Sequence, residues 1–182
     1  MRRTIGAVIL AAALAACATK DKAAAPMPAD AASGNAAIGA PAPAFAVATI
    51  GGDSVRIGGT AKKQPVTLVN VWATWCGPCK AEFPELQTLH TVFAPKGLRV
   101  VAISIDTEAD SVVSASAKSM GATFAIGRDP DDQVRGRFAA VGIPETWLIG
   151  TDGTLLWRHS GAIAPGDDGV RSAIAAALAG AQ

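Results

Sequence analysis

An apolar strand that leads directly into a Cys-x-x-Cys motif is the feature that most constrains how this chain folds. The run Val66–Trp72 is almost continuously apolar, which is typical of a strand covered on both faces. The motif WCGPC follows at positions 75–79, and apolar residues then recur at helical spacing to about Phe93. A second apolar strand over 98–105 completes a strand–helix–strand unit, which predicts parallel strands joined by a right-handed crossover.

The position of the two cysteines at the start of a helix predicts redox chemistry. Unpaired N–H groups and the helix dipole favour negative charge there, so Cys76 is expected to be a nucleophilic thiolate. Cys79 falls on the same helix face one turn deeper, within reach of a disulfide. It can therefore resolve a mixed disulfide formed by Cys76. Pro78 restrains the first turn, and Trp75 shields one side of the nucleophile.

The remaining pattern predicts an α/β sandwich with a mixed sheet. A hairpin is expected over 45–57, around Gly51-Gly52-Asp53. A helix over about 107–120 begins at a capping-box-like Thr107-x-x-Asp110. A short strand at 124–126 precedes a helix whose expected apolar face holds Val134, Phe138 and Val141.

The C-terminal part predicts two tightly joined antiparallel strands and a last helix. The strands are expected over 145–149 and 155–159. Asp167 or Asp168 is expected to cap the helix, with Val170, Ile174 and Leu178 as its buried stripe.

The N-terminus is typical of an export signal rather than of a fold element. Two arginines precede an apolar segment, residues 5–16, that is too short to span a membrane with margin. The segment ends in Leu-Ala-Ala-Cys17, which resembles a bacterial lipobox, so we expect lipid modification of Cys17. Ordinary cleavage beside a chance cysteine is the alternative. The composition of residues 17–39 predicts a disordered Ala/Pro-rich tether, and residues 40–182 are expected to form the folded domain. The tether would hold this domain at a membrane surface outside the cytoplasm.

Composition excludes several classes of function. A net charge of +1 gives no basic surface for nucleic acid. Three cysteines are too few for a disulfide-stapled miniprotein. A zinc site needs four ligands, whereas the Cys pair supplies two and His90 and His159 lie far away in sequence, so no metal is expected.

Two longer segments carry a family resemblance. The string VNVWATWCGPCKAEFP at 69–84 resembles the membrane-tethered, extracytoplasmic thioredoxins of the TlpA/ResA type. GIPETWLI at 142–149 resembles the cis-proline segment of the CcmG/DsbE branch, and the helix at 107–120 matches the insertion of this group. The resemblance covers roughly residues 40–180. It implies a thioredoxin fold, with a mixed central sheet flanked by helices, an N-terminal β-hairpin extension and a central helical insertion.

The resemblance also implies roles for residues around the cysteines. It places Pro144 after a cis bond with its ring against the Cys pair, and leaves the Ile143 backbone free to pair with an extended substrate. Trp75, Gly77 and Pro78 are expected to contact substrate as well.

Three polar residues near the motifs are also candidates for a role in the chemistry. Glu82 matches a glutamate of the ResA-type pattern and is expected to tune the thiols or relay a proton, with a solvated helix-face carboxylate as the alternative. Asn70 stands where thioredoxins bury an aspartate beneath the cysteines, and its neutral amide cannot accept the Cys79 proton. A hydrogen-bonded core amide is the alternative interpretation of Asn70. Glu145 is expected to add negative charge near Cys76 or to contact substrate.

These features predict a thiol:disulfide oxidoreductase that acts as a reductant in the bacterial periplasm. Gly-Pro between the cysteines resembles thioredoxin, whose potential is about −270 mV. The resemblance implies disulfides of exported proteins as substrates, apocytochrome c among them, and a DsbD/CcdA-type membrane electron donor. We expect a monomer without a cofactor. The alternatives are a tethered binding or chaperone module without turnover, and a thiol oxidase or isomerase. A peroxiredoxin would need threonine three residues before its reactive cysteine, where this chain has Ala73.

Overall fold

The computed structural model describes residues 36–59 and 64–181, which form a sheet of seven strands in the order β2-β1-β5-β4-β3-β6-β7. The strands are β1 (Phe45–Thr49), β2 (Ser54–Ile57), β3 (Val66–Trp72), β4 (Leu98–Ser104), β5 (Ala125–Arg128), β6 (Glu145–Ile149) and β7 (Leu155–Ser160). The helices are α1 (Gly77–Phe93), η1 (Ala94–Lys96), α2 (Asp110–Ser119), α3 (Gln133–Phe138) and α4 (Asp168–Ala179).

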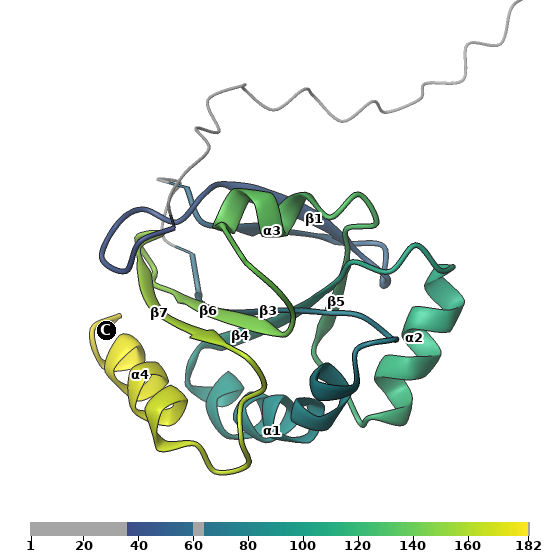
Figure 1. Ribbon diagram of the computed structural model, residues 1–182. Coiled ribbons are helices and arrows are strands. Elements are labelled where there is room, and N and C mark those ends of the chain that lie inside the picture. The colour runs from purple at the N-terminus through teal and green to yellow at the C-terminus, as the bar shows by residue number, and fades with distance from the viewer. Residues whose placement is uncertain (1–35, 60–63, 182) are drawn as a thin grey trace, which may run out of the picture.

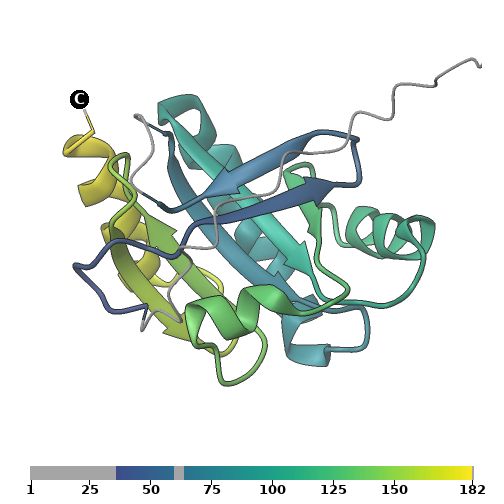
Figure 2. The same cartoon turned by 90° about the horizontal axis from the view of Figure 1, so that it is seen from above.

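The predicted strand–helix–strand unit forms the centre of the molecule. β3 and β4 are parallel neighbours and α1 connects them, as the apolar pattern predicted. Every residue of β3 is buried, because the sheet is covered on both faces. α1 and α4 lie on one face and α3 on the other (Figure 1). Seen from above, α2 lies beside the sheet rather than over it (Figure 2).

Aromatic side chains pack in the core on both faces of the sheet. On the α1 face, Trp72 packs edge-on against Phe83, with ring centroids 4.6 Å apart. On the α3 face, Phe138 packs against Trp147 at 4.7 Å. All four of these side chains are fully buried, so β3 and α1 form a rigid support for the Cys-x-x-Cys motif between them.

The structure differs from the sequence-based predictions at two helices. α2 begins at Asp110 and its N-cap is Ala109, with no side-chain cap bond, so the capping box at Thr107 is wrong. α3 ends at Phe138 because Ala139 adopts a left-handed conformation, with φ of 50°. Val141 therefore leaves the helix face and is 89% exposed, whereas the pattern had placed it in the core.

The start of the folded domain also differs from the expected boundary at residue 40. Ala36 is already buried, and the Gly39 N–H donates to the Leu155 carbonyl at 2.8 Å. Residues 1–35, which hold the predicted signal peptide, Cys17 and most of the tether, lie outside the described residues. Among the helices that the structure describes, none has the length and apolar character needed to cross a bilayer.

Of the two candidate caps for the last helix, the structure selects Asp167, whose carboxylate accepts from the Val170 N–H at 3.0 Å. We expect Asp167→Ala to lower the free energy of unfolding by about 1 kcal/mol, because it leaves this first-turn N–H without its acceptor. Asp168→Ala is the matched control, since Asp168 lies in the first turn but makes no cap bond. Urea denaturation checks both. Equal losses for the two variants would contradict the assignment of the cap.

Candidate active site

The two cysteines form a disulfide at the start of α1, with their Cα atoms 5.3 Å apart. Cys76 is the N-cap of the helix, and its sulfur accepts from the Cys79 N–H at 3.2 Å. This N–H is one of the helix donors that have no partner within the helix, so it is available to stabilise negative charge on the Cys76 sulfur. Cys79 is fully buried, whereas Cys76 retains 6% exposure. Only the first cysteine is thus accessible to a partner molecule.

The segment before β6 lies directly beside the disulfide. The Ile143–Pro144 peptide bond is cis, as the resemblance implied, and the Ile143 carbonyl oxygen lies 3.9 Å from the Cys76 sulfur. The Gly161 N–H donates to the Pro144 carbonyl at 2.9 Å, which brings the β7–α4 loop to the same place. Sequence reasoning missed Gly161, since no local motif marks it and only the sheet pairing of β6 with β7 brings it here.

Apolar residues around Cys76 are displayed to solvent. Trp75 is 68% exposed, and Gly77 and Pro78 are exposed as well, so all three can contact a partner. Val141, two residues before Ile143, is also largely exposed. Large exposed apolar side chains beside a reactive group are typical of a surface that binds another polypeptide.

Glu82 lies in α1, about one turn after Cys79, and is only 1% exposed. Its Oε1 accepts from Asn70 Nδ2 at 2.7 Å, and its Oε2 accepts from the Ile163 N–H at 2.9 Å. Burial raises the pKa of Glu82 from 4.5 to about 7, and the two hydrogen bonds oppose this shift. The solvated alternative is therefore wrong, and the carboxyl group is able to exchange a proton near neutral pH.

The raised pKa of Glu82 predicts that the disulfide form loses stability as the pH rises. Unfolding returns the carboxyl group to its usual pKa of 4.5, so the folded state binds the proton more tightly. The stabilisation is complete below pH 4.5 and is lost as the pH rises through about 7, with a total of roughly 3 kcal/mol. Urea denaturation of the oxidised protein between pH 4 and 8 measures this loss. Glu82→Gln should remove it, and an unchanged slope in that variant would assign the effect to another group.

Asp106 is a second buried carboxylate near the motif that sequence reasoning missed. It follows β4, is 1% exposed and accepts from the Thr74 N–H at 2.9 Å and the Thr74 hydroxyl at 2.6 Å. It also accepts from Ser104 at 2.7 Å. These bonds fix the turn that carries Trp75 and Cys76. The only signal in the sequence was an acidic residue at the end of an apolar strand, which by itself indicates no partner.

Glu145 does not lie where a substrate could touch it. It is 1% exposed and forms an ion pair with Arg158, whose second terminal nitrogen donates to the Ala139 carbonyl at 2.9 Å. The expected contact with substrate is therefore not available in this structure. Instead, the pair ties β6 and β7 to the start of the loop that carries Val141 and Ile143.

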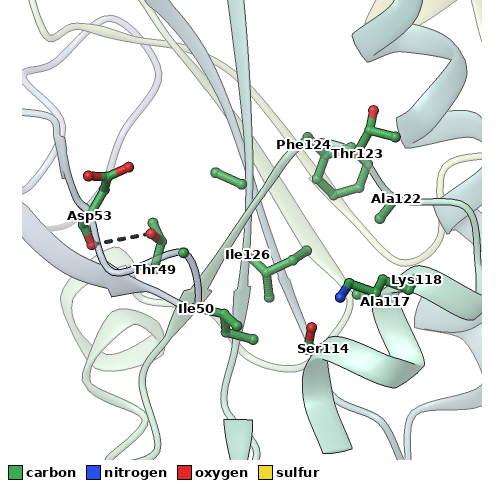
Figure 3. Close-up of a pocket in the computed structure, with 12 residues that line it drawn as sticks. Thr49, Ile50, Asp53, Ser114, Ala117, Lys118, Ala122, Thr123, Phe124 and Ile126 are labelled. Carbon is green, nitrogen blue, oxygen red and sulfur yellow. Dashed lines mark hydrogen bonds between the residues drawn. The ribbon is translucent and has the colours of Figure 1, made fainter. Parts of the chain in front are cut away.

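A separate cavity of about 430 Å³ lies between the end of β1 and α2, away from the cysteines. Ile50, Phe124 and Ile126 form its apolar part, and Asp53 and Lys118 lie at its edges (Figure 3). Within residues 36–59 and 64–181, no group of three or more His, Cys, Asp or Glu side chains is arranged to hold a metal ion.

Comparison with known proteins places these features in one family. The AhpC/TSA family model matches residues 38–158. CycY, a thiol:disulfide interchange protein from Rhizobium leguminosarum, is 38% identical over 100 residues, which are 54% of this chain and 52% of CycY. The thiol-disulfide oxidoreductase ResA from Geobacillus thermodenitrificans is 31% identical over 119 residues, 65% of this chain and 67% of that protein. The match thus spans about half of CycY and two thirds of this ResA.

Solved structures agree on the fold. A crystal structure from Chlorobium tepidum, described as a thiol:disulfide interchange protein DsbE, superposes with a TM-score of 0.70 at 29% identity. The superposition covers 78% of this chain and 98% of the other. The predicted thioredoxin fold is therefore confirmed, with the hairpin β1–β2 and the helix α2 as additions to it. By fold, by the Cys pair and by sequence, this chain belongs to the AhpC/TSA family and is similar to its ResA, CycY and DsbE thiol-disulfide proteins.

Proposed function

We propose that this protein is a thiol:disulfide oxidoreductase that reduces disulfides in exported proteins. The observation that carries the proposal is the placement of Cys76. Its sulfur caps α1, accepts from the Cys79 N–H and lies 3.9 Å from the Ile143 carbonyl, on a surface with exposed apolar side chains. A nucleophilic sulfur is thus held beside a backbone segment that can pair with an extended peptide.

The reaction begins from the dithiol form. The Cys76 thiolate attacks one sulfur of a substrate disulfide, so a mixed disulfide forms and the other substrate sulfur leaves as a thiolate that takes up a proton. Cys79 then attacks the Cys76 sulfur, the intramolecular disulfide forms, and the second substrate sulfur leaves with the electron pair. Two electrons pass from the Cys pair to the substrate, and no cofactor is needed for this transfer.

The second step needs a proton acceptor inside the protein, because Cys79 is fully buried and must lose its proton before it attacks. Glu82 lies one helical turn further along α1, and its pKa of about 7 suits it to accept a proton near neutral pH. Asn70 itself cannot accept that proton, because its amide is neutral. In this proposal Glu82 receives the Cys79 proton and passes it on to the departing substrate thiolate or to water.

The cellular setting is part of the proposal. An N-terminal export signal and a lipobox-like sequence at Cys17 support a lipid anchor, with the domain facing the periplasm. A reductant in an oxidising compartment needs electrons from across the membrane, which supports a DsbD/CcdA-type donor. Apocytochrome c is the specific substrate that the resemblance to the CcmG branch favours. Retention of Cys17→Ala in the membrane fraction would contradict the lipid anchor.

The test of the activity is turbidimetric insulin reduction by dithiothreitol, with the reduction potential measured against glutathione. We expect the purified domain to accelerate precipitation of insulin, and its potential to lie near that of thioredoxin, about −270 mV. No acceleration would overturn the proposal and favour a binding module. A potential above about −180 mV would instead indicate a thiol oxidase or isomerase.

A further inference from the structure

Asn70 lies in the middle of β3 and joins three elements of the site. It is fully buried, and both hydrogens of its amide nitrogen are used. One is donated to Glu82 Oε1 at 2.7 Å, and the other to the Thr146 hydroxyl at 3.0 Å. Thr146 is the strand partner of Asn70 in β6, two residues after Pro144. The amide thus connects the strand beneath the cysteines, the carboxyl group on α1 and the strand that follows the cis-proline.

The buried side chain of Asn70 would destabilise the folded state if its only role were to fill the core. Its carbonyl oxygen Oδ1 is buried and has no hydrogen-bond partner among the described residues. A buried acceptor without a partner destabilises the folded state, whereas an apolar residue of the same size would not. The neighbours in β3 are all apolar apart from Thr67. The amide therefore fits a role in directing Glu82 better than a role in the core.

Among the described residues, no cationic side chain forms an ion pair with Glu82 from the sheet or from the β7–α4 loop. The sheet offers Asn70 and Thr146, both neutral, and the β7–α4 loop offers the Ile163 N–H. On α1 itself Cys79 lies one turn earlier in a disulfide, and the next carboxylate, Glu85, is paired with Arg171 of α4 at 2.5 Å. Two neutral donors, the Asn70 amide and the Ile163 N–H, therefore hold the ionised Glu82 carboxylate. The bond from Asn70 is the shorter of the two.

From this arrangement we propose that Asn70 is a positioning residue for the resolving step. Its amide fixes the Glu82 carboxylate in place and favours the ionised form that accepts the Cys79 proton. This inference rests on the proposed function, in which Glu82 is that acceptor. It assigns to Asn70 an effect on the rate at low pH that a purely structural amide would not have.

The test is the pH profile of the resolving step in Asn70→Leu, followed in single turnovers from a mixed disulfide by tryptophan fluorescence. Loss of a hydrogen bond to a charged acceptor should move the inflection assigned to Glu82 upward by about one pH unit. The rate at pH 6 should then fall about tenfold, while the rate at pH 9 stays within about twofold of the unmodified protein.

A double-mutant cycle with Glu82→Gln separates positioning from stability. In the Glu82→Gln background, adding Asn70→Leu should change the rate less than about twofold at any pH, since its target is gone. Asn70→Ser is the second variant if Asn70→Leu does not fold. The carboxyl ¹³C resonance of Glu82, followed against pH, should show the same upward shift without relying on activity.

An unmoved inflection, or an equal loss of rate at all pH values, would overturn the role of Asn70. In that case the unmodified protein would still reduce insulin, and only this inference would fail. If the unmodified protein does not reduce insulin, the proposed function fails instead. The two failures are therefore distinguishable from the same set of samples.

Discussion

Cys76→Ser is expected to abolish disulfide exchange, with the catalysed rate of insulin reduction falling on the order of 10³-fold or more. The hydroxyl group of serine is not ionised near neutral pH, so the N-cap geometry and the Cys79 N–H at 3.2 Å would have no thiolate to stabilise. The fold should be retained, because serine caps helices well. Insulin turbidity and a melting curve on the same sample check both statements.

Cys79→Ala is expected to leave Cys76 able to attack but unable to complete the reaction. The mixed disulfide should accumulate, because the buried sulfur that resolves it is missing. Expressed in the cell envelope, this variant should retain substrates in covalent complexes that dithiothreitol releases and mass spectrometry identifies. Cys76→Ser with Cys79→Ala is the matched control, and Cys17 is left unchanged in both so that it cannot account for a difference.

Accumulation of the same complexes in the double variant would contradict attack by Cys76. Complexes that form through Cys79 in Cys76→Ser, but not through Cys76 in Cys79→Ala, would reverse the assigned roles. The exposure of the two residues argues against such a reversal, since Cys79 is fully buried whereas Cys76 keeps 6% of its surface exposed.

The fold was predictable where it depends on local sequence. The apolar run of β3, the cysteines at the head of α1 and the stripe Val170, Ile174, Leu178 in α4 each follow from residues close together in the chain. The disulfide itself needs only a spacing of three residues on one helix. These features were predicted without knowledge of the tertiary structure, and the structure has all of them.

The features that could not be predicted depend on partners far away in sequence. Asp106 accepts a hydrogen bond from the Thr74 N–H, 32 residues away in sequence, and Glu82 accepts one from the Ile163 N–H, 81 residues away. Val141 belonged to an apolar helical pattern, but the left-handed turn at Ala139 ends α3 before it. Glu145 was expected near substrate because it follows Pro144, yet its partner Arg158 lies on the next strand, in a register that the sequence does not specify.

The pair of Glu145 with Arg158 predicts a large effect on stability. Glu145 is 1% exposed, and the Arg158 side chain is 26% exposed. Removing the cation in Arg158→Met leaves a buried carboxylate without its counter-charge, which destabilises proteins by about 3–5 kcal/mol when the pair is fully buried. Because Arg158 is partly exposed, we expect a loss of roughly 2–4 kcal/mol, and a fall in melting temperature of about 5–15 °C.

The control variants decide whether that loss comes from an unpaired buried charge. Arg135→Met breaks the ion pair with Asp132, in which both side chains are about a third exposed, and should cost less than about 1 kcal/mol. Adding Glu145→Gln to Arg158→Met should recover part of the loss, since the buried charge is then gone. If instead the double variant were only as stable as Arg158→Met, the destabilisation would arise from the lost bond between Arg158 and the Ala139 carbonyl, which both variants lack. Urea denaturation of the three variants and the unmodified protein at one pH distinguishes these outcomes, because only the buried-charge account predicts recovery.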